Sequence, residues 1–315
     1  MSRIHDALKK ATQERATVPA GDSAALPPEA VPASPDWNSS APAVLSDLAT
    51  GASSLAALPS SHLRFDDLRA RCAHPEWQLD PNVNVFFNTG LSPHAAEQFR
   101  TLRTRLYQLR SSQSLRTVLV TSAVAGEGKT FVTSNLGQAI VHQPDRRALI
   151  IDADLRCARL HLPLGAPTAP GLTDYLRGEA DEMAIIQHGV EGNLCFIPGG
   201  NEVSNPSELL SNGRLKKLLD HLTPVFDWVI LDSPPCVPVA DASIIAALCD
   251  GVVLVVRAGS TPTRVAQRAC QELQGKIVGV VLNAIDEFHA NGSHYYQADG
   301  YGYGKGKTAS KDLRQ

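Results

Sequence analysis

The stretch Ala123-Val-Ala-Gly-Glu-Gly-Lys-Thr130 has the residue types and spacing of a phosphate-binding loop. It follows an apolar run over 117–121 and opens a helical pattern of apolar residues, which is the strand–loop–helix context that this motif requires. Its glycines let backbone N–H groups converge on one point, where the following helix adds the positive end of its dipole. The lysine would then reach the β- and γ-phosphates and the threonine hydroxyl would ligate Mg²⁺. The residues expected to contact the nucleotide are Gly126, Glu127, Gly128, Lys129, Thr130 and Phe131.

Carboxylates follow two further apolar runs that read as strands. Asp152 and Asp154 come after 148–151, and Asp232 ends the run 228–232 in the form of a Walker B segment. A Walker B aspartate holds Mg²⁺, and the additional pair Asp152 and Asp154 beside a γ-phosphate points to further Mg²⁺ ligation or to a general base. Asp154 alone could instead cap a helix, and Arg156 could either steady phosphate charge or pair with one of the acids.

Asn283 ends another apolar run and carries an amide that both donates and accepts hydrogen bonds. Such a group suits the edge of an adenine ring. Because asparagine is also common where strands end, both interpretations stay open from the residue alone.

The spacing of apolar residues predicts an α/β domain of the P-loop NTPase type over residues 91–285. Strands are expected at 117–121, 148–152, 228–232, 251–256 and 277–282, with helices near 93–110, 206–222, 240–249 and 262–274. Continuous β-branched runs that alternate with helices indicate a mostly parallel sheet covered by helices on both faces. The loops at the carboxyl ends of its strands would form the site.

The predicted helix 93–110 has two distinct faces. Its apolar residues form one stripe, while Glu97, Arg100 and Arg103, three residues apart, share a second face that is largely turned away from the core. By itself this pattern is equally typical of a solvated charged face.

Both ends of the chain differ in composition from this domain. Residues 1–16 predict a short amphipathic helix, 17–60 a disordered Ala/Pro/Ser-rich linker, 61–90 a partly ordered connection and 286–315 a flexible tail. The tail is Gly-rich and holds four of the six tyrosines: Tyr295, Tyr296, Tyr301 and Tyr303. No apolar run approaches the ~18 residues of a membrane span, and a net charge of −3 gives no field that would recruit nucleic acid. We therefore expect a cytoplasmic protein that meets the membrane only through a partner.

At these motifs the chain resembles the bacterial tyrosine autokinases (BY-kinases) of exopolysaccharide and capsule assembly. Residues 123–130 look like their Walker A, 150–156 like their Walker A′ and 229–235 like their Walker B. Glu97-Gln-Phe-Arg-Thr-Leu-Arg103 is similar to the Glu-x-x-Arg-x-x-Arg helix through which these kinases form rings, and the tail matches their tyrosine cluster. The opening ten residues and the Pro-rich linker resemble the stand-alone subgroup, whose membrane chain-length partner is a separate polypeptide.

The resemblance implies that ATP and Mg²⁺ are bound and that the tail tyrosines are phosphorylated. Lys129 would contact phosphate, Asp152 would position metal and take the tyrosine proton, and Thr130, Asp154 and Asp232 would support Mg²⁺. The implied partners are other copies in a ring, the cytoplasmic end of a chain-length determinant (polysaccharide co-polymerase) and a tyrosine phosphatase. The tail tyrosines are few and Gly-spaced rather than a dense run.

Two other functions fit parts of the sequence. A partitioning or positioning P-loop ATPase would share the fold, but the signature lysine of that class is missing before Gly126. A non-catalytic ATP-binding subunit of an export complex would keep the loop and use the tail as a low-complexity docking segment.

Overall fold

The computed structural model describes residues 63–87, 93–189, 192–273 and 275–285. The strands are β1 (Thr117–Ser122), β2 (Ala148–Asp152), β3 (Gln187–His188), β4 (Leu194–Ile197), β5 (Trp228–Asp232), β6 (Gly251–Arg257) and β7 (Ile277–Asn283). The helices are α2 (Phe65–Arg71), α3 (Pro93–Ser112), α4 (Lys129–Val141), α5 (His161–Leu164), α6 (Leu172–Arg177), α7 (Glu182–Ile185), α8 (Pro206–Ser211), α9 (Arg214–Leu222), α10 (Asp241–Leu248) and α11 (Thr263–Glu272).

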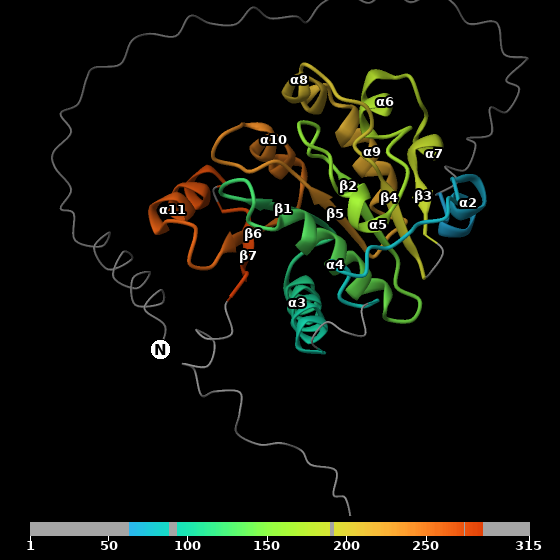
Figure 1. Ribbon diagram of the computed structural model, residues 1–315. Coiled ribbons are helices and arrows are strands. Elements are labelled where there is room, and N and C mark those ends of the chain that lie inside the picture. The colour runs from blue at the N-terminus through green and yellow to red at the C-terminus, as the bar shows by residue number, and fades with distance from the viewer. Residues whose placement is uncertain (1–62, 88–92, 190–191, 274, 286–315) are drawn as a thin grey trace, which may run out of the picture. The chain divides into compact units, whose positions relative to one another are not determined.

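Within the described ranges the strands form one seven-stranded sheet in the order β3-β4-β2-β5-β1-β6-β7 (Figure 1). All neighbours pair in parallel except β3 and β4, which pair antiparallel at one edge. β1 lies between β5 and β6, so the strand that leads into the phosphate-binding loop is central. Its register places Val120 beside Asp232 of β5.

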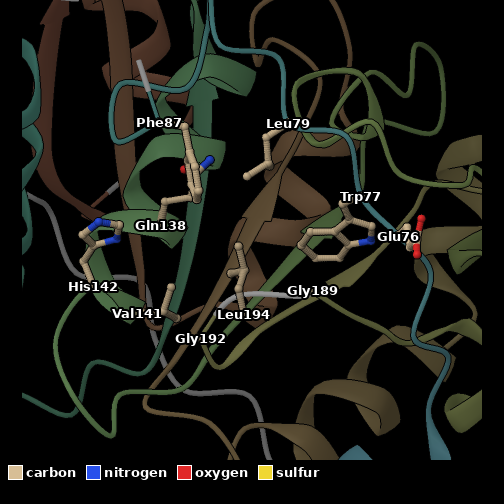
Figure 2. Close-up of a pocket in the computed structure, with 10 residues that line it drawn as sticks. All are labelled: Glu76, Trp77, Leu79, Phe87, Gln138, Val141, His142, Gly189, Gly192 and Leu194. Atoms are coloured by element: carbon tan, nitrogen blue, oxygen red, sulfur yellow. The ribbon is translucent and has the colours of Figure 1, made fainter. Parts of the chain in front are cut away.

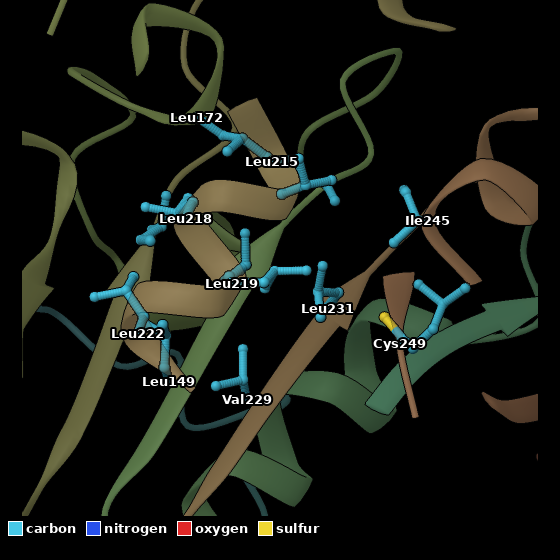
Figure 3. Packing of buried hydrophobic residues seen from close by; sticks show 14 of the residues in the cluster. Leu149, Leu172, Leu215, Leu218, Leu219, Leu222, Val229, Leu231, Ile245 and Cys249 are labelled. Atoms are coloured by element: carbon cyan, nitrogen blue, oxygen red, sulfur yellow. The ribbon is translucent and has the colours of Figure 1, made fainter. Parts of the chain in front are cut away.

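The two faces of the sheet carry separate apolar cores, because successive side chains of a strand point to opposite faces. In β1, Leu119 packs in the core beneath α6, α8, α9 and α10, while Val118 and Val120 pack beneath α3 and α4. Figure 3 shows the first of these cores, in which the leucines of α9 pack against Val229 and Leu231 of β5. Helices on both faces leave the carboxyl ends of the strands as the place for a site.

The prediction of an α/β fold with a mostly parallel, doubly covered sheet is confirmed. The expected strands and the helices over 93–110, 240–249 and 262–274 are present to within two residues. The single helix expected over 206–222 is wrong: α8 and α9 are separate, because Gly213 adopts a left-handed conformation (φ 81°) between them. The short strands β3 and β4 and helices α5 to α7 were not foreseen.

The connection expected over 61–90 contains α2, whose Phe65 and Leu68 are buried. Farther on, Trp77 packs edge-on against Phe196 of β4 (6.1 Å between ring centroids). The amphipathic helix 1–16, the linker 17–60 and the tail with its four tyrosines lie outside the described residues and stay predictions. None of the helices in the described ranges is long and apolar enough to cross a membrane.

Candidate active site

The phosphate-binding loop connects β1 to α4 with the geometry its glycines allow. Gly126 and Gly128 have φ values of 82° and 96°, a region that residues with a side chain rarely adopt. Gly128 caps α4, so the amino end of a 13-residue helix faces the loop. A Cβ on Gly128 would also clash with the Asn283 side-chain amide, and the φ of 96° disfavours any residue with a side chain.

Asp152 and Asp232 end neighbouring strands in register, which brings the Walker A′ and Walker B carboxylates together behind the loop. The Thr130 hydroxyl donates to Asp232 Oδ2 (2.6 Å), and the Thr133 hydroxyl lies 3.4 Å from Asp232 Oδ1. Asp152 accepts backbone hydrogen bonds from Leu160 (2.8 Å) and Asp154 (3.2 Å). Both carboxylates are fully buried at the carboxyl edge of the sheet.

Lys129 reaches across this cluster. Its Nζ forms an ion pair with Asp154 Oδ2 (2.9 Å), and both side chains are mostly buried. Burial disfavours the lysine's charge, but the nearby Asp232 and Asp154 outweigh it and raise the pKa of Lys129. The ammonium group is therefore held charged among the strand-end acids, where phosphate oxygens would also be attracted.

Burial also sets the state of the two strand-end carboxylates. It raises the pKa of Asp152 well above its usual range, with the Asp232 charge adding to the effect. It raises the pKa of Asp232 to about 6, although Lys129 and the Thr130 hydroxyl act in the opposite direction. Desolvated acids of this kind bind a cation strongly and accept protons readily, which is the pattern of a functional site.

Arg156 pairs with Asp241 of α10, and not with Asp152 or Asp154, the acids that its position in the sequence suggested. Its Nε and Nη2 donate to the two oxygens of buried Asp241 in α10 (2.7 and 3.1 Å), and Nη2 also lies 3.1 Å from Ser207 Oγ. These bonds raise the pKa of Arg156. The guanidinium thus ties the loop after β2 to α8 and α10.

Glu127 braces the phosphate-binding loop instead of pointing outward. Its buried carboxylate accepts from the Val124 N–H (2.8 Å) and from the Thr261 hydroxyl after β6. Asn283 Nδ2 donates to the Glu127 carbonyl (2.9 Å), and Arg257 Nη1 to the Gly126 carbonyl (3.1 Å). Sequence reasoning missed Arg257 and Thr261, because neither belongs to a motif.

The charged residues of α3 divide into two kinds. Glu97 and Arg100 are exposed and pair with each other (3.1 Å). Arg103 is half-buried and donates to the Ala139 carbonyl of α4 (2.6 Å), so it also holds α3 against the phosphate-loop helix. Phe131 packs edge-on against Phe99 of α3 (5.6 Å between ring centroids), which places its ring in the same interface.

A separate cavity of about 610 Å³ lies at the end of α4 opposite the loop, beside Gln138, Val141 and His142 (Figure 2). Its lining residues are Glu76, Trp77, Leu79, Phe87, Gln138, Val141, His142, Gly189, Gly192 and Leu194. None of the residues in the strand-end cluster lines it, so volume alone does not locate the chemistry.

Together, the loop, the strand-end acids and the parallel sheet define a P-loop nucleotide-binding protein. The family model described as cellulose biosynthesis protein BcsQ matches residues 115–280, about half of the chain. The tyrosine-protein kinase YwqD of Bacillus subtilis is 34% identical over 203 residues, which cover 64% of this chain and 85% of YwqD. CpsD of Streptococcus agalactiae, also a tyrosine-protein kinase, is 34% identical over 63% of this chain and 87% of its own length.

Longer relatives match over part of their length. The putative tyrosine-protein kinase EpsB of Ralstonia solanacearum is 36% identical over 66% of this chain but only 28% of EpsB. Among solved structures, the kinase domain of Escherichia coli tyrosine kinase ETK is 34% identical, with a TM-score of 0.58 over 66% of this chain and 80% of that one. The chain therefore belongs to the bacterial tyrosine-protein kinases.

Proposed function

We propose that this protein is an ATP-dependent tyrosine autokinase that phosphorylates the tyrosines of its own tail, in trans within an oligomer. The observation that carries the proposal is the strand-end cluster: Lys129 paired with Asp154, and Thr130 bound to Asp232 beside Asp152. A P-loop that only binds nucleotide has no need of the additional acids after β2. Kinase relatives that match most of their own length support the same reaction.

The reaction needs positioning and neutralised charge more than covalent help from the protein. The phenol oxygen of a tyrosine bonds to the γ-phosphorus, the bond from that phosphorus to the β–γ bridging oxygen breaks, and ADP leaves. The phenol proton passes to Asp152. Because burial raises the pKa of Asp152, its carboxylate accepts a proton more readily than a free one would.

The donor set fits Mg²⁺. In the described ranges no group of three or more His, Cys, Asp or Glu is placed to hold a metal ion by itself. Mg²⁺ commonly uses one or two carboxylates together with phosphate oxygens and water. Thr130 and Asp232 would hold it, with Asp152 and Asp154 behind them. Bound there, the ion would neutralise charge that develops on the phosphates.

The placement of the remaining residues supports the binding roles proposed for them. The N–H groups of residues 126–130 would receive the phosphates. Asn283, beside Gly128 at the end of β7, would contact the adenine edge by exchanging its bond to the Glu127 carbonyl. Arg156 would position the loop after β2 through its bonds to Asp241 and would not contact phosphate directly, because two of its nitrogens already bind that carboxylate.

Regulation would follow from assembly. Glu97 and Arg100 lie exposed on α3, as a ring contact requires. Each phosphotyrosine adds about −1.5 to −2 charges, so four per subunit would repel neighbouring tails and loosen the ring. A tyrosine phosphatase would reverse this. The cycle would control exopolysaccharide polymerisation and export through a membrane chain-length determinant that recruits the cytoplasmic kinase. The BcsQ model's description, which names cellulose biosynthesis, supports a polysaccharide role.

A mixing experiment tests phosphorylation in trans. Lys129→Met with an intact tail is combined with a catalytically intact variant whose four tail tyrosines are phenylalanine, and Mg-ATP is added. We expect phosphotyrosine on Tyr295–Tyr303 of the Lys129→Met chain, detected by mass spectrometry, and none when that chain is incubated alone. ATP turnover without phosphotyrosine would favour the partitioning-type ATPase, and bound but unconsumed ATP would favour the regulatory subunit.

A second experiment tests the role of α3. Arg100→Glu places two acids together on the exposed face, whereas substitution of Arg103 also removes its bond to Ala139 and confounds assembly with stability. We expect Arg100→Glu to be monomeric by light scattering and to lose at least about tenfold in tail phosphorylation. Full phosphorylation of a strictly monomeric Arg100→Glu would contradict phosphorylation in trans.

A further inference from the structure

A second, polar pocket of about 300 Å³ lies immediately beside the strand-end acids. It is formed by the loops after β2 and β4, at the same edge of the sheet as the site. The lining residues are Leu155, Arg156, Cys157, Ala158, Arg159, His161, Thr168, Gly199, Gly200, Asn201 and Glu202. The N–H of Cys157 in this lining donates to Asp154 Oδ1 (3.1 Å), so the pocket wall adjoins the strand-end acids, although Asp152 itself is fully buried.

The position of the pocket assigns it to the acceptor side of the reaction. Asn283, the proposed contact to adenine, ends β7, and the strands β6, β1 and β5 separate β7 from β2. The Lys129–Asp154 ion pair lies where the phosphates of the nucleotide would be bound, between β7 and β2. A group that approaches the γ-phosphate from the side opposite the adenine therefore passes the loops after β2 and β4.

The arginines that line this pocket are in different states. Arg156 is bound on two nitrogens by Asp241, which neutralises it. Arg159 is exposed, and no carboxylate in the described ranges pairs with it. Glu202 is the acid of the lining, and no ion pair joins it to Arg159. Arg159 is therefore a cation able to bind an acidic group that enters the pocket.

The tail offers one acid of the right kind. From residue 288 to 311 the single Asp or Glu is Asp299, two residues before Tyr301. In an extended segment, residues i and i+2 point to the same side, about 6.6 Å apart. Asp299 and Tyr301 can thus face the protein together. The 17 residues between Asn283 and Tyr301 give the tail a coil span of roughly 24 Å, which is available for reaching the pocket of a neighbouring subunit.

We propose that this pocket is an acceptor subsite in which Arg159 binds an acidic side chain two residues before the acceptor tyrosine, and that Asp299 is that side chain for Tyr301. The proposal rests on the proposed autokinase function and deepens it by naming what selects the tyrosine. Tyr295 and Tyr296 have no acid two residues before them, so their phosphorylation does not use this contact.

A charge exchange in the full chain tests the pair. Initial rates of phosphorylation at each tail tyrosine are measured by mass spectrometry with Mg-ATP for the wild type, Arg159→Glu, Asp299→Arg and the double variant. We expect each single variant to lower the Tyr301 rate at least about fivefold while Tyr295 stays within about twofold, and the double variant to restore most of the loss. Lys217→Glu, the same charge change at an exposed position of α9, is the matched control and should behave as wild type.

The outcomes separate the two proposals. A Tyr301 rate unchanged by Arg159→Glu, or a double variant no better than the product of the single effects, overturns the acceptor subsite and leaves the kinase intact. Equal loss at Tyr295 and Tyr301 also overturns it, because the defect would then be general. A wild type without phosphotyrosine overturns the proposed function, and the subsite with it.

Discussion

At the scale of single residues, the fully buried Asp232 shows a conflict between stability and function. Its pKa of about 6 lies above the ordinary value of an aspartate because burial penalises the charge. A raised carboxylate pKa means that the ionised group destabilises the folded chain at neutral pH, and that this penalty fades as pH falls through about 6. The proposed Mg²⁺ site would need this charge, which would account for its retention in a buried position.

Replacement of this charge should therefore stabilise the protein while abolishing activity. We expect Asp232→Asn to raise the free energy of unfolding of the nucleotide-free chain at pH 7 by about 1–2 kcal/mol, less than the full pKa shift implies, because Lys129 loses an attractive partner. Urea unfolding measures this. The gain should shrink as the pH is lowered from 7 to 5, where the wild-type carboxyl becomes protonated. A destabilised Asp232→Asn would show that the acid is structural.

The sequence predicted which motif residues come together better than it predicted their hydrogen-bond partners. Lys129, Thr130, Asp152, Asp154 and Asp232 converge because each follows or ends a strand, and parallel strands bring their carboxyl ends to one edge. The bond from Arg156 to Asp241 spans 85 positions and follows no periodic pattern. The same holds for Glu127, whose carboxylate is drawn inward by donors more than 120 residues later in the chain.

At the scale of elements, the phosphate-loop helix α4 is held by a polar clamp. The segment 78–87 lies along it, and Asn135 both accepts from the Val85 N–H (2.9 Å) and donates to the Val83 and Phe131 carbonyls (2.8 and 3.0 Å). Gln138 donates to Asn84 in the same clamp. A buried helix face is expected to be apolar, whereas α4 carries polar side chains on one of its buried sides. These hydrogen bonds satisfy the polar groups, which explains how they are tolerated there.

Loss of this clamp should loosen the helix that carries Lys129. Asn135→Ala leaves the Val85 N–H and the Val83 carbonyl without their partner, so we expect a loss of about 2–4 kcal/mol in the free energy of unfolding. Asn82→Ala, which removes an exposed asparagine that bonds only locally to Asp80, should cost less than about 1 kcal/mol. Chemical denaturation of the pair measures the difference, and equal costs would show that the clamp contributes nothing.

Elements with strong periodicity, such as α3 and the central strands, were predictable because burial imposes the pattern. The clamp segment was not, because its bonds join irregular backbone to side chains far along the chain. The break at Gly213 was missed although its signals are local. Asn212-Gly213 is a dipeptide typical of turns, and Leu210 and Leu215 on its two sides are five residues apart, which is not a helical spacing.

At the scale of the whole molecule, a histidine at the β3 edge of the sheet makes the stability of the fold depend on pH. His188 is buried there beside Arg69 and the His74 ring, and burial with these neighbours lowers its pKa to about 4. A histidine held neutral in the fold but protonated in the unfolded chain favours unfolding at low pH. The contribution of the neutral His188 ring to stability is complete above about pH 6.5 and is lost as the pH falls towards 4.

We expect His188→Gln to flatten the fall in stability between pH 6.5 and 4.5 by about 1–2 kcal/mol. Thermal unfolding across this range measures the slope. His142→Gln, which removes an exposed histidine, serves as the control. Parallel slopes for wild type and His188→Gln would show that other groups govern the acid response.

The fold class could be inferred from the sequence because alternation of strands and helices is a property of the entire domain. The order of strands could not, since it depends on which apolar faces fit together. That order has a consequence for synthesis on the ribosome. β1 hydrogen-bonds to β5 and β6, and the first of these begins 111 residues after β1 does. A nascent chain that has not reached Trp228 carries the complete phosphate-loop motif but lacks β5 beside it. The ATP site can therefore form only after more than 100 further residues have been added, and until then the apolar β1 segment is exposed to chaperones.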